Sequence, residues 1–394
     1  MVNPTYEKLG SAPSMIRELF AYGLRRSAEV GPENVFDYSL GNPSIPAPQP
    51  VQQALLDVLH DTDPIQVHGY SMAGGFDGTR RAVAEDLTRR FGMTIRPEEL
   101  FFTCGAAAAL ISVIRALTVS PDSEFVAIAP YFPEYLPFVE SNGGKLVSVP
   151  ADLDTFQISL DILEAHLTSH TQAVLVNSPN NPTGVVYSRQ TLEGLAELLR
   201  PKSTQFGHPI YLIADEPYRE LVYDGVEVPF LPTIYPNTLV CYSYSKSLSL
   251  PGERIGYVCV PSCVEGQADV LHAGAARSSG HVCPPTLVQL ALQRCADARP
   301  DLAAYDANRR LLYRELTQMG YECIPPQGAF YLFVRVPDGD DVAFSQRAKL
   351  EHDLLVVPST AFHCPGFLRL SYCVSHDMIL RSLPAFRAIR EKYQ

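Results

Sequence analysis

The sequence predicts an α/β fold built on a mostly parallel sheet. Between residues 124 and 261, short apolar runs rich in β-branched residues alternate with turns and helical stretches. Strands that are apolar along their whole length are buried on both faces, and a helix between two strands allows them to run parallel. Such sheets bind ligands at the carboxyl ends of their strands, so the polar residues that follow each run are the first candidates for a site.

The apolar runs define the predicted strands, which are EFVAIAP (124–130), KLVSVP (145–150), QAVLVNSP (172–179), IYLIADEPY (210–218), LVCYSYS (239–245) and IGYVCVP (255–261). The helices predicted beside them include GAAAALISVIRAL (105–117) and SRQTLEGLAELLR (188–200). Strands that alternate with helices in this way predict a sheet covered by helices on both faces.

A second, smaller α+β domain is predicted after residue 286. A long helical region extends to about residue 319, and after it come AFYLFVRVP (329–337), a helix at 341–351, DLLVVP (353–358), FLRLSYCV (367–374) and a closing helix at 376–392. Near the start of the chain, an amphipathic helix (14–29) and the proline-rich GNPSIPAPQP (41–50) precede the large domain. The predicted division is an N-terminal arm with part of the small domain (1–47), a large domain (48–286) and a C-terminal small domain (287–394).

The composition narrows the function classes. The chain has 394 residues, 46% of them apolar, and a net charge of −12, which argues against nucleic acid or an anionic membrane as a partner. No apolar run approaches the length of a membrane span, and the N-terminus has no apolar segment of the signal-peptide type. The nine cysteines are scattered without a CxxC motif, which predicts no metal site and a reducing compartment, the cytoplasm.

The stretch CYSYSKSLSLPGERIGY (241–257) contains an isolated lysine, Lys246, followed eight residues later by Arg254. A lysine amine has an ordinary pKa of about 10.4, and only its neutral form attacks a carbonyl carbon. Apolar surroundings and a nearby cation both favour that neutral form. The alternative is an ordinary surface lysine at the end of a strand.

Four other segments place polar or small residues where a ligand site is expected. IADEPY puts Asp215 and Tyr218 at a strand end, where the aspartate either faces a positive partner or only caps a turn. NSPNNPTG (177–184) forms a tight turn in which Asn181 offers an amide, and TCGAAAAL (103–110) leads through glycine into a helix whose first N–H groups suit a phosphate. FLRLSY holds Arg369 in an apolar strand, paired either with a carboxylate ligand or with an internal acid.

The order and spacing of these segments resemble the aspartate-aminotransferase family of pyridoxal-phosphate (PLP) enzymes, fold type I. The resemblance extends from GNPSIPAP to FLRLSY and includes YSMAGGFDGTRRAVA (70–84). It implies a mostly parallel seven-stranded sheet in a large domain and a smaller α+β domain formed from both termini. It also implies a homodimer in which Tyr70 reaches the cofactor phosphate of the partner subunit.

The resemblance implies a role for each candidate residue. Lys246 would bind PLP covalently and move the substrate Cα proton, and Asp215 would keep the ring nitrogen protonated. The phosphate would be held by Ser243, Arg254 and the amides of Ala106 and Ala107, the ring oxygen by Tyr218 and Asn181, and the ring face by Phe132. Arg369 would bind the substrate α-carboxylate, with Gly41 and Asn181 assisting.

The chain departs from the family pattern at two points. Some bacterial members carry a lysine in the glycine turn for a distal substrate carboxylate, and Ala107 stands at that position here. Arg277, seven residues before Pro284, is an alternative candidate for that carboxylate, although it also fits a structural arginine. The chain has no tryptophan, and Phe132 replaces the tryptophan usual on the ring face.

The expected function is a PLP-dependent aminotransferase acting on an L-amino acid, with aspartate as a candidate donor and 2-oxoglutarate as acceptor. A PLP-dependent C–S lyase of the same fold needs the same lysine, aspartate and arginine, so it is the nearest alternative. A PLP-binding regulatory protein is a further alternative, but the sequence has no basic helix-turn-helix segment before the resemblance begins.

Overall fold

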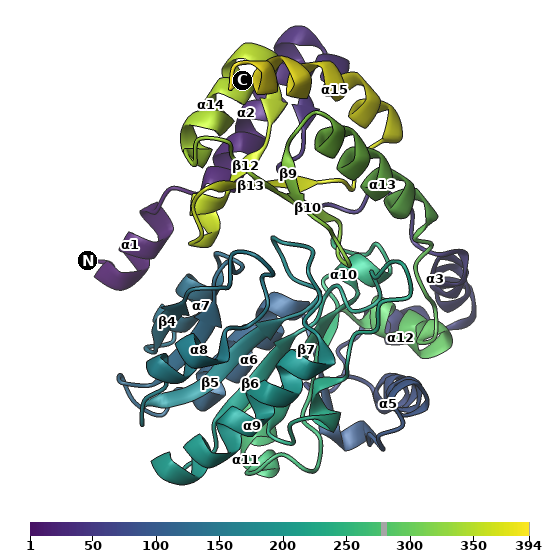
Figure 1. Cartoon of the computed structure of the whole chain (residues 1–394). Coiled ribbons are helices and arrows are strands. Elements are labelled where there is room, and N and C mark those ends of the chain that lie inside the picture. The colour runs from purple at the N-terminus through teal and green to yellow at the C-terminus, as the bar shows by residue number, and fades with distance from the viewer. Residues whose placement is uncertain (277–281, 394) are drawn as a thin grey trace.

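A seven-stranded sheet forms the centre of the larger part of the molecule (Figure 1). The computed structural model describes residues 1–276 and 282–393. The strands follow the order β2-β8-β7-β6-β5-β3-β4. Their bounds are β2 Leu100–Thr103, β3 Glu124–Ile128, β4 Lys145–Val149, β5 Thr171–Asn177, β6 Tyr211–Asp215, β7 Thr238–Ser243 and β8 Gly256–Cys259.

The sheet is mostly parallel, as the sequence predicts. The pairs β3–β4, β3–β5, β5–β6 and β6–β7 run parallel, whereas β8 is antiparallel to both of its neighbours, β7 and β2. The six predicted strands all form, in most cases a few residues shorter than their apolar runs. The full strand β2 was not predicted, because only four residues separate the charged turn before it from the glycine turn after it.

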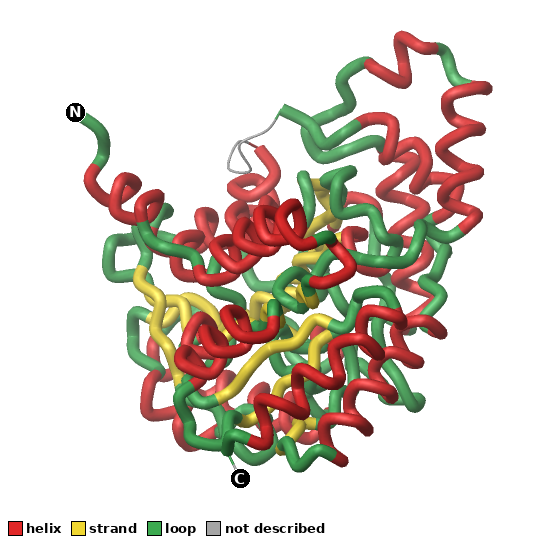
Figure 2. The backbone as a smooth tube through the Cα atoms, turned by 90° about the horizontal axis from the view of Figure 1, so that it is seen from above, coloured by secondary structure: helices red, strands yellow, loops and turns green. Residues whose placement is uncertain are grey.

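Helices cover both faces of this sheet. In β3, Val126 and Ile128 belong to the core shared with α5 (Asp77–Phe91) and α9 (Arg189–Phe206), while Phe125 and Ala127 belong to the core shared with α6 (Ala106–Leu117). Each strand therefore buries apolar side chains on both sides, which explains why the runs in the sequence are continuous rather than alternating. Figure 2 shows the strands enclosed by helices.

The smaller part of the molecule combines segments from both ends of the chain. Its antiparallel sheet, of order β12-β13-β10-β9, consists of β9 Glu322–Ile324, β10 Tyr331–Arg335, β12 Val357–Pro358 and β13 Phe367–Ser371. The helices around it are α2 Met15–Val30, α13 Ala303–Gln318, α14 Asp341–His352 and α15 His376–Glu391. The short strand β1 (Phe36–Asp37) pairs in parallel with β11 (Leu354–Leu355), which joins the N-terminal segment to the C-terminal one.

The predicted helical region from 286 to 319 is two helices rather than one. It divides into α12 (Thr286–Cys295) and α13, and Pro300 lies in the connection, where its ring and missing N–H interrupt helical hydrogen bonding. α12 packs against α3 (Gln49–Asp61) and α5, and its Val288 and Leu292 lie in the large core. The domain boundaries at residues 47 and 286 stay predictions, and this packing favours a second boundary that follows α12.

The remaining helices of the larger part are short or peripheral to the site. Their bounds are α4 Pro64–His68, α7 Tyr135–Glu140, α8 Leu160–His166, α10 Tyr244–Ser247 and α11 Gln267–Ala276. At the N-terminus, α1 (Pro4–Ser11) projects from the body of the molecule (Figure 1). The Tyr6 hydroxyl of α1 donates to the Ser141 carbonyl at 2.8 Å, so this helix contacts the larger part.

Candidate active site

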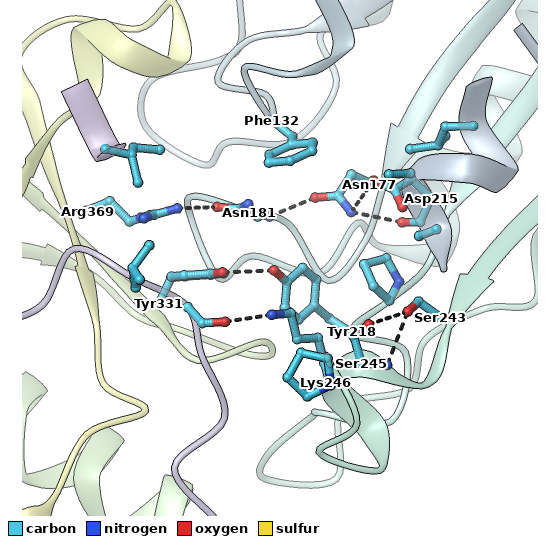
Figure 3. A pocket seen from close by; sticks show the side chains of 18 of the residues that line it. Phe132, Asn177, Asn181, Asp215, Tyr218, Ser243, Ser245, Lys246, Tyr331 and Arg369 are labelled. Carbon is cyan, nitrogen blue, oxygen red and sulfur yellow. Dashed lines mark hydrogen bonds between the residues drawn. The ribbon is translucent and has the colours of Figure 1, made fainter. Parts of the chain in front are cut away.

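A cavity of about 310 Å³ lies where the carboxyl ends of β5, β6 and β7 face the smaller sheet. Asn177, Asp215 and Ser243 are the last residues of these three strands, and all of them line it. Tyr331 and Arg369 reach it from β10 and β13 of the smaller sheet (Figure 3). The other lining residues are Ile16, Leu40, Gly41, Ala106, Ala107, Leu110, Phe132, Asn181, Pro217, Tyr218, Ser245, Lys246, Pro251 and Arg254.

Asp215 is a buried carboxylate with one partnered and one free oxygen. Its Oδ2 accepts a 2.6 Å hydrogen bond from the Tyr135 hydroxyl, while Oδ1 is buried without a hydrogen-bond partner. Asn177 holds the same strand end, because its Nδ2 donates to the Asp215 carbonyl at 2.8 Å. Burial raises the pKa of Asp215 to about 6, against the opposing effect of the Tyr135 hydrogen bond. An orphaned buried oxygen of this kind is suited to a cationic N–H donor from a ligand.

Lys246 points into the same cavity from α10. Its Nζ donates a 2.6 Å hydrogen bond to the Gly41 carbonyl and lies 5.7 Å from the centre of the Phe330 ring. Burial lowers the pKa of Lys246 to about 8, and the positive charges of Arg369 and Arg254 add to that lowering. Among the described residues, no carboxylate pairs with the Lys246 side chain. Near pH 8 a substantial fraction of this side chain is therefore the neutral, nucleophilic amine.

The N-terminus of α6 and the residues around Ser243 form one corner of the cavity. No side chain caps α6, so its first N–H groups, those of Ala106 and Ala107, remain available to an anion. Arg254 lies against this turn and donates from Nη2 to the Cys104 carbonyl at 3.2 Å. Gly105 is needed here, because its φ is +86° and a Cβ atom would lie 2.7 Å from the Arg254 Nη2.

Arg369 brings a buried positive charge to the opposite side of the cavity. The residue is 3% exposed, its Nη1 donates to the Asn181 Oδ1 at 3.1 Å, and its Nη2 donates to the Ser39 carbonyl. Its Nε has no hydrogen-bond partner, and no described acidic side chain forms an ion pair with it. Burial lowers the pKa of Arg369 from its ordinary value. A buried guanidinium without an acid is matched by an anionic ligand.

Two tyrosines lie between the lysine and the arginine. The hydroxyls of Tyr218 and Tyr331 are 2.8 Å apart, and the Tyr331 ring lies beneath Arg369, with 4.7 Å between the guanidinium carbon and the ring centre. Phe132 stands across the cavity from them (Figure 3). These side chains give the cavity flat apolar faces between its two charged ends.

The cavity contains nearly all of the predicted site residues. Of the described candidates, the lining includes Gly41, Ala106, Ala107, Phe132, Asn181, Asp215, Tyr218, Ser243, Lys246, Arg254 and Arg369. Tyr70 does not line it. Its side chain is 85% exposed in the loop after α4, and its contact to a partner subunit stays a prediction. Arg277 lies outside the described residues.

Several lining or supporting residues were not predicted. Asn177 has a visible signal, since it ends the apolar run that precedes the Asn-Pro turn. Tyr135, Tyr331 and Ile16 have none, because the sequence around each is explained by packing and only the tertiary structure brings them to the cavity. Among the described residues no cluster of histidine, cysteine or acidic side chains forms a metal site. Within the same ranges, every helix is too short or too polar to cross a bilayer.

Comparisons with known proteins identify the family of this chain. The family model for aminotransferase class I and II matches residues 33–386. Aspartate aminotransferase of Thermotoga maritima is 31% identical over 89% of this chain and 90% of its own length, and aspartate/prephenate aminotransferase of Thermus thermophilus is 31% identical over 89% of each. The crystal structure of an aminotransferase from Eubacterium rectale has 52% sequence identity and a TM-score of 0.97, covering 100% of this chain and 99% of that one.

These relatives are named as aminotransferases, which does not favour the lyase alternative. The fold agrees as well, because the mostly parallel seven-stranded sheet is that of PLP enzymes of fold type I. The chain therefore belongs to the class I and II aminotransferase family, whose members use pyridoxal phosphate to transfer an amino group between an amino acid and a 2-oxo acid.

Proposed function

We propose that the cavity at the ends of β5, β6 and β7 is the PLP site of this aminotransferase, with aspartate as amino donor and 2-oxoglutarate as acceptor. The observation that carries the proposal is the pair of unmet charges in one cavity. The buried Asp215 Oδ1 has no donor, and the buried Arg369 has no acid. A protonated pyridine nitrogen satisfies the first and a substrate α-carboxylate satisfies the second.

The residues of the cavity fit PLP at each of its polar groups. Asp215 would bind the ring nitrogen, with Tyr135 and Asn177 fixing the direction of its carboxylate. The uncapped start of α6, the Ser243 hydroxyl and Arg254 would hold the phosphate. Tyr218 and Asn181 would bond the ring oxygen, and Phe132 would cover one face of the ring.

Bound PLP supplies an electron sink for the bonds at the substrate Cα. The protein supplies the proton transfer. The neutral amine of Lys246 would take the proton from the substrate Cα and deliver it to a carbon of the bound cofactor. A pKa of about 8 suits that task, because a base near the working pH both accepts and releases a proton readily. Arg369 and Asn181 hold the substrate carboxylate, which fixes the Cα–H bond relative to Lys246.

A homodimer would complete the site. Tyr70 is 85% exposed, and the neighbouring Met72 and Ile65 are 74% and 83% exposed, which is unusual for large apolar side chains so close together along the chain. A second copy of the chain would cover this surface and receive the Tyr70 hydroxyl at its own phosphate corner. We place the enzyme in the cytoplasm because the nine cysteines form no disulfide among the described residues.

Aspartate is supported by the two relatives named for that substrate. A dicarboxylic substrate needs a second cation beside Arg369. Among the described lining residues the other cations are Lys246 and Arg254, and both have proposed roles toward PLP. Ala107 supplies no charge at the position where some family members have lysine. Arg277 therefore remains the candidate for the distal carboxylate.

A donor panel tests this function. The purified enzyme is incubated with aspartate, alanine or phenylalanine, with and without 2-oxoglutarate, and glutamate is measured. We expect glutamate only when both substrates are present, with aspartate preferred. Pyruvate and ammonia formed from a donor alone would contradict transfer.

In Arg277→Ala, the preference for aspartate over alanine should fall about tenfold or more, and an unchanged preference would remove Arg277 from the site. Arg335→Ala, in which the lost arginine is bonded to Glu322, is the control.

A further inference from the structure

Tyr331 is a cavity residue that the roles above do not use. It is 2% exposed, and its hydroxyl lies 2.8 Å from the hydroxyl of Tyr218 (Figure 3). Either oxygen can be the donor in that contact. Each tyrosine hydroxyl has one proton, so the direction of this bond decides which hydroxyl remains free to donate elsewhere.

The backbone holds Tyr331 firmly in this place. Ala329, two residues earlier, has a φ of +57°, a left-handed conformation that is unfavourable for residues other than glycine. Three hydrogen bonds maintain it: its N–H donates to the Leu221 carbonyl at 2.8 Å, and its own carbonyl accepts from Tyr223 at 2.6 Å and from Tyr372 at 3.2 Å. These bonds fix the backbone immediately before β10, from which Tyr331 reaches the cavity.

The Gly41 backbone packs closely against the Tyr331 hydroxyl. A Cβ atom at Gly41 would overlap this hydroxyl and would lie 3.0 Å from the Phe330 ring. The same Gly41 accepts the hydrogen bond from Lys246. The Tyr331 oxygen is therefore confined between the Gly41 backbone and Tyr218, and Tyr218 is the hydrogen-bond partner that the structure gives it.

We infer that Tyr331 is a positioning residue of the aminotransferase site, and that its hydroxyl donates to Tyr218 so that the Tyr218 proton is free to bond the ring oxygen of PLP. This inference rests on the proposed contact between Tyr218 and that oxygen. The two bonds then point in one direction, from Tyr331 to Tyr218 to an anionic oxygen. Hydrogen bonds aligned in series polarise one another, so the first bond strengthens the second.

Loss of the Tyr331 hydroxyl has a spectroscopic consequence. A weaker donor at the ring oxygen stabilises the negative form of that oxygen less, so a higher pH is needed to remove the proton that the bound cofactor shares with it. The visible absorbance of bound PLP reports this titration without turnover. A role in packing alone would change the thermal stability and leave the absorbance titration unchanged.

The test titrates the absorbance of the PLP-loaded enzyme against pH. We expect Tyr331→Phe, which keeps the ring under Arg369, to raise the midpoint by roughly half a pH unit to one unit. Tyr218→Phe should raise it further, and the double variant should match Tyr218→Phe alone. Tyr38→Phe, which loses a buried hydroxyl bond to Ser382 elsewhere, should cause no shift.

The outcomes separate this inference from the proposed function. If Tyr218→Phe shifts the midpoint and Tyr331→Phe does not, Tyr331 has no positioning role. A shift in the double variant equal to the sum of the single shifts overturns the inference as well, because it means that the two hydroxyls act independently. If neither variant shifts the midpoint, the proposed contact of Tyr218 with the ring oxygen is wrong, and the inference fails with it.

Discussion

The Tyr135 hydroxyl donates a 2.6 Å hydrogen bond to one oxygen of Asp215 and leaves the other oxygen of that buried carboxylate without a partner. This arrangement places a negative charge where a ligand can bind it. The unpartnered charge destabilises the protein when no ligand is present. A carboxylate with one fixed and one free oxygen has a defined direction, and that direction is toward the cavity that Lys246 also lines. Stability is given up here in favour of binding.

That cost predicts how the cofactor-free protein responds to pH. Burial raises the pKa of Asp215 from its ordinary value of 3.8 to about 6. Between these pH values the folded protein holds a proton that the unfolded chain has lost, so the free energy of unfolding falls as pH rises. Above pH 6, Asp215→Asn without cofactor should be more stable than the wild type by roughly 2–3 kcal/mol.

Urea unfolding of both cofactor-free proteins at pH 4 and pH 7 measures this difference. With saturating PLP the order should reverse, because only the wild type then gains an ionic bond to the ring nitrogen. The same variant should lose about 10²-fold or more in kcat/KM. If the free energy of unfolding depends on pH equally in the two cofactor-free proteins, the pKa of Asp215 is not raised in the folded state.

Lys246 should make the rate of PLP capture depend on pH in a characteristic way. Burial lowers its pKa to about 8, and only the neutral amine reacts. The capture rate of cofactor-free enzyme should therefore rise about tenfold per pH unit below pH 8 and level off above it. Stopped-flow absorbance gives this rate, and butylamine under the same conditions is the control for the titration of PLP itself. A rise that continues to pH 10 would mean that the pKa of Lys246 is not lowered.

Arg369→Lys should show whether the substrate carboxylate needs only the positive charge of Arg369 or also its two parallel hydrogen bonds. Lysine keeps the positive charge but cannot form the two parallel bonds of a guanidinium. We expect kcat/KM for amino acids to fall about 10²-fold or more, while the reaction with a matching amine that lacks the carboxylate changes little. Arg335→Lys, at a half-buried arginine stacked on Phe367, should leave both reactions unchanged. An equal loss with both substrates would place Arg369 in a structural role.

Mixing two inactive variants tests whether Tyr70 acts across a subunit interface. Tyr70→Ala should lose most of its activity, and Lys246→Ala should lose all of it. A mixed dimer has one site with an intact lysine from one subunit and an intact Tyr70 from the other. Co-refolding the two variants should therefore restore activity to at most one site per mixed dimer. If Tyr70 acts within its own chain, no site in the mixture is intact and no activity returns.

Much of the fold was predictable because its signals are local. The strands on which the site depends are apolar on both faces, and residues such as Asp215 and Ser243 stand where those runs end. The predicted long helical region was not divided into α12 and α13, although Pro300 marks the division. The two-residue strand β1 was missed because it pairs with β11, more than 300 residues away, whereas β11 lies within the predicted DLLVVP segment (353–358).

The candidate site was predictable to the extent that its chemistry is unusual in sequence. An isolated lysine or an arginine in an apolar strand invites explanation, and Lys246 and Arg369 both line the cavity. Tyr331 does not stand out, since AFYLF is typical of a core strand. Its place at the cavity depends on the pairing of β10 with β13, which is not visible in the sequence.

Borohydride reduction of the PLP-loaded enzyme, followed by peptide mass mapping, shows which lysine binds the cofactor. Borohydride reduces a carbon–nitrogen double bond between the cofactor and a lysine to a stable single bond. We predict a single pyridoxyl adduct on Lys246, absent from Lys246→Ala and retained in Lys145→Ala, where the substituted lysine pairs with Asp122 on the surface. An active enzyme with no adduct, or with its adduct on a different lysine, would contradict the assignment of this cavity as the PLP site.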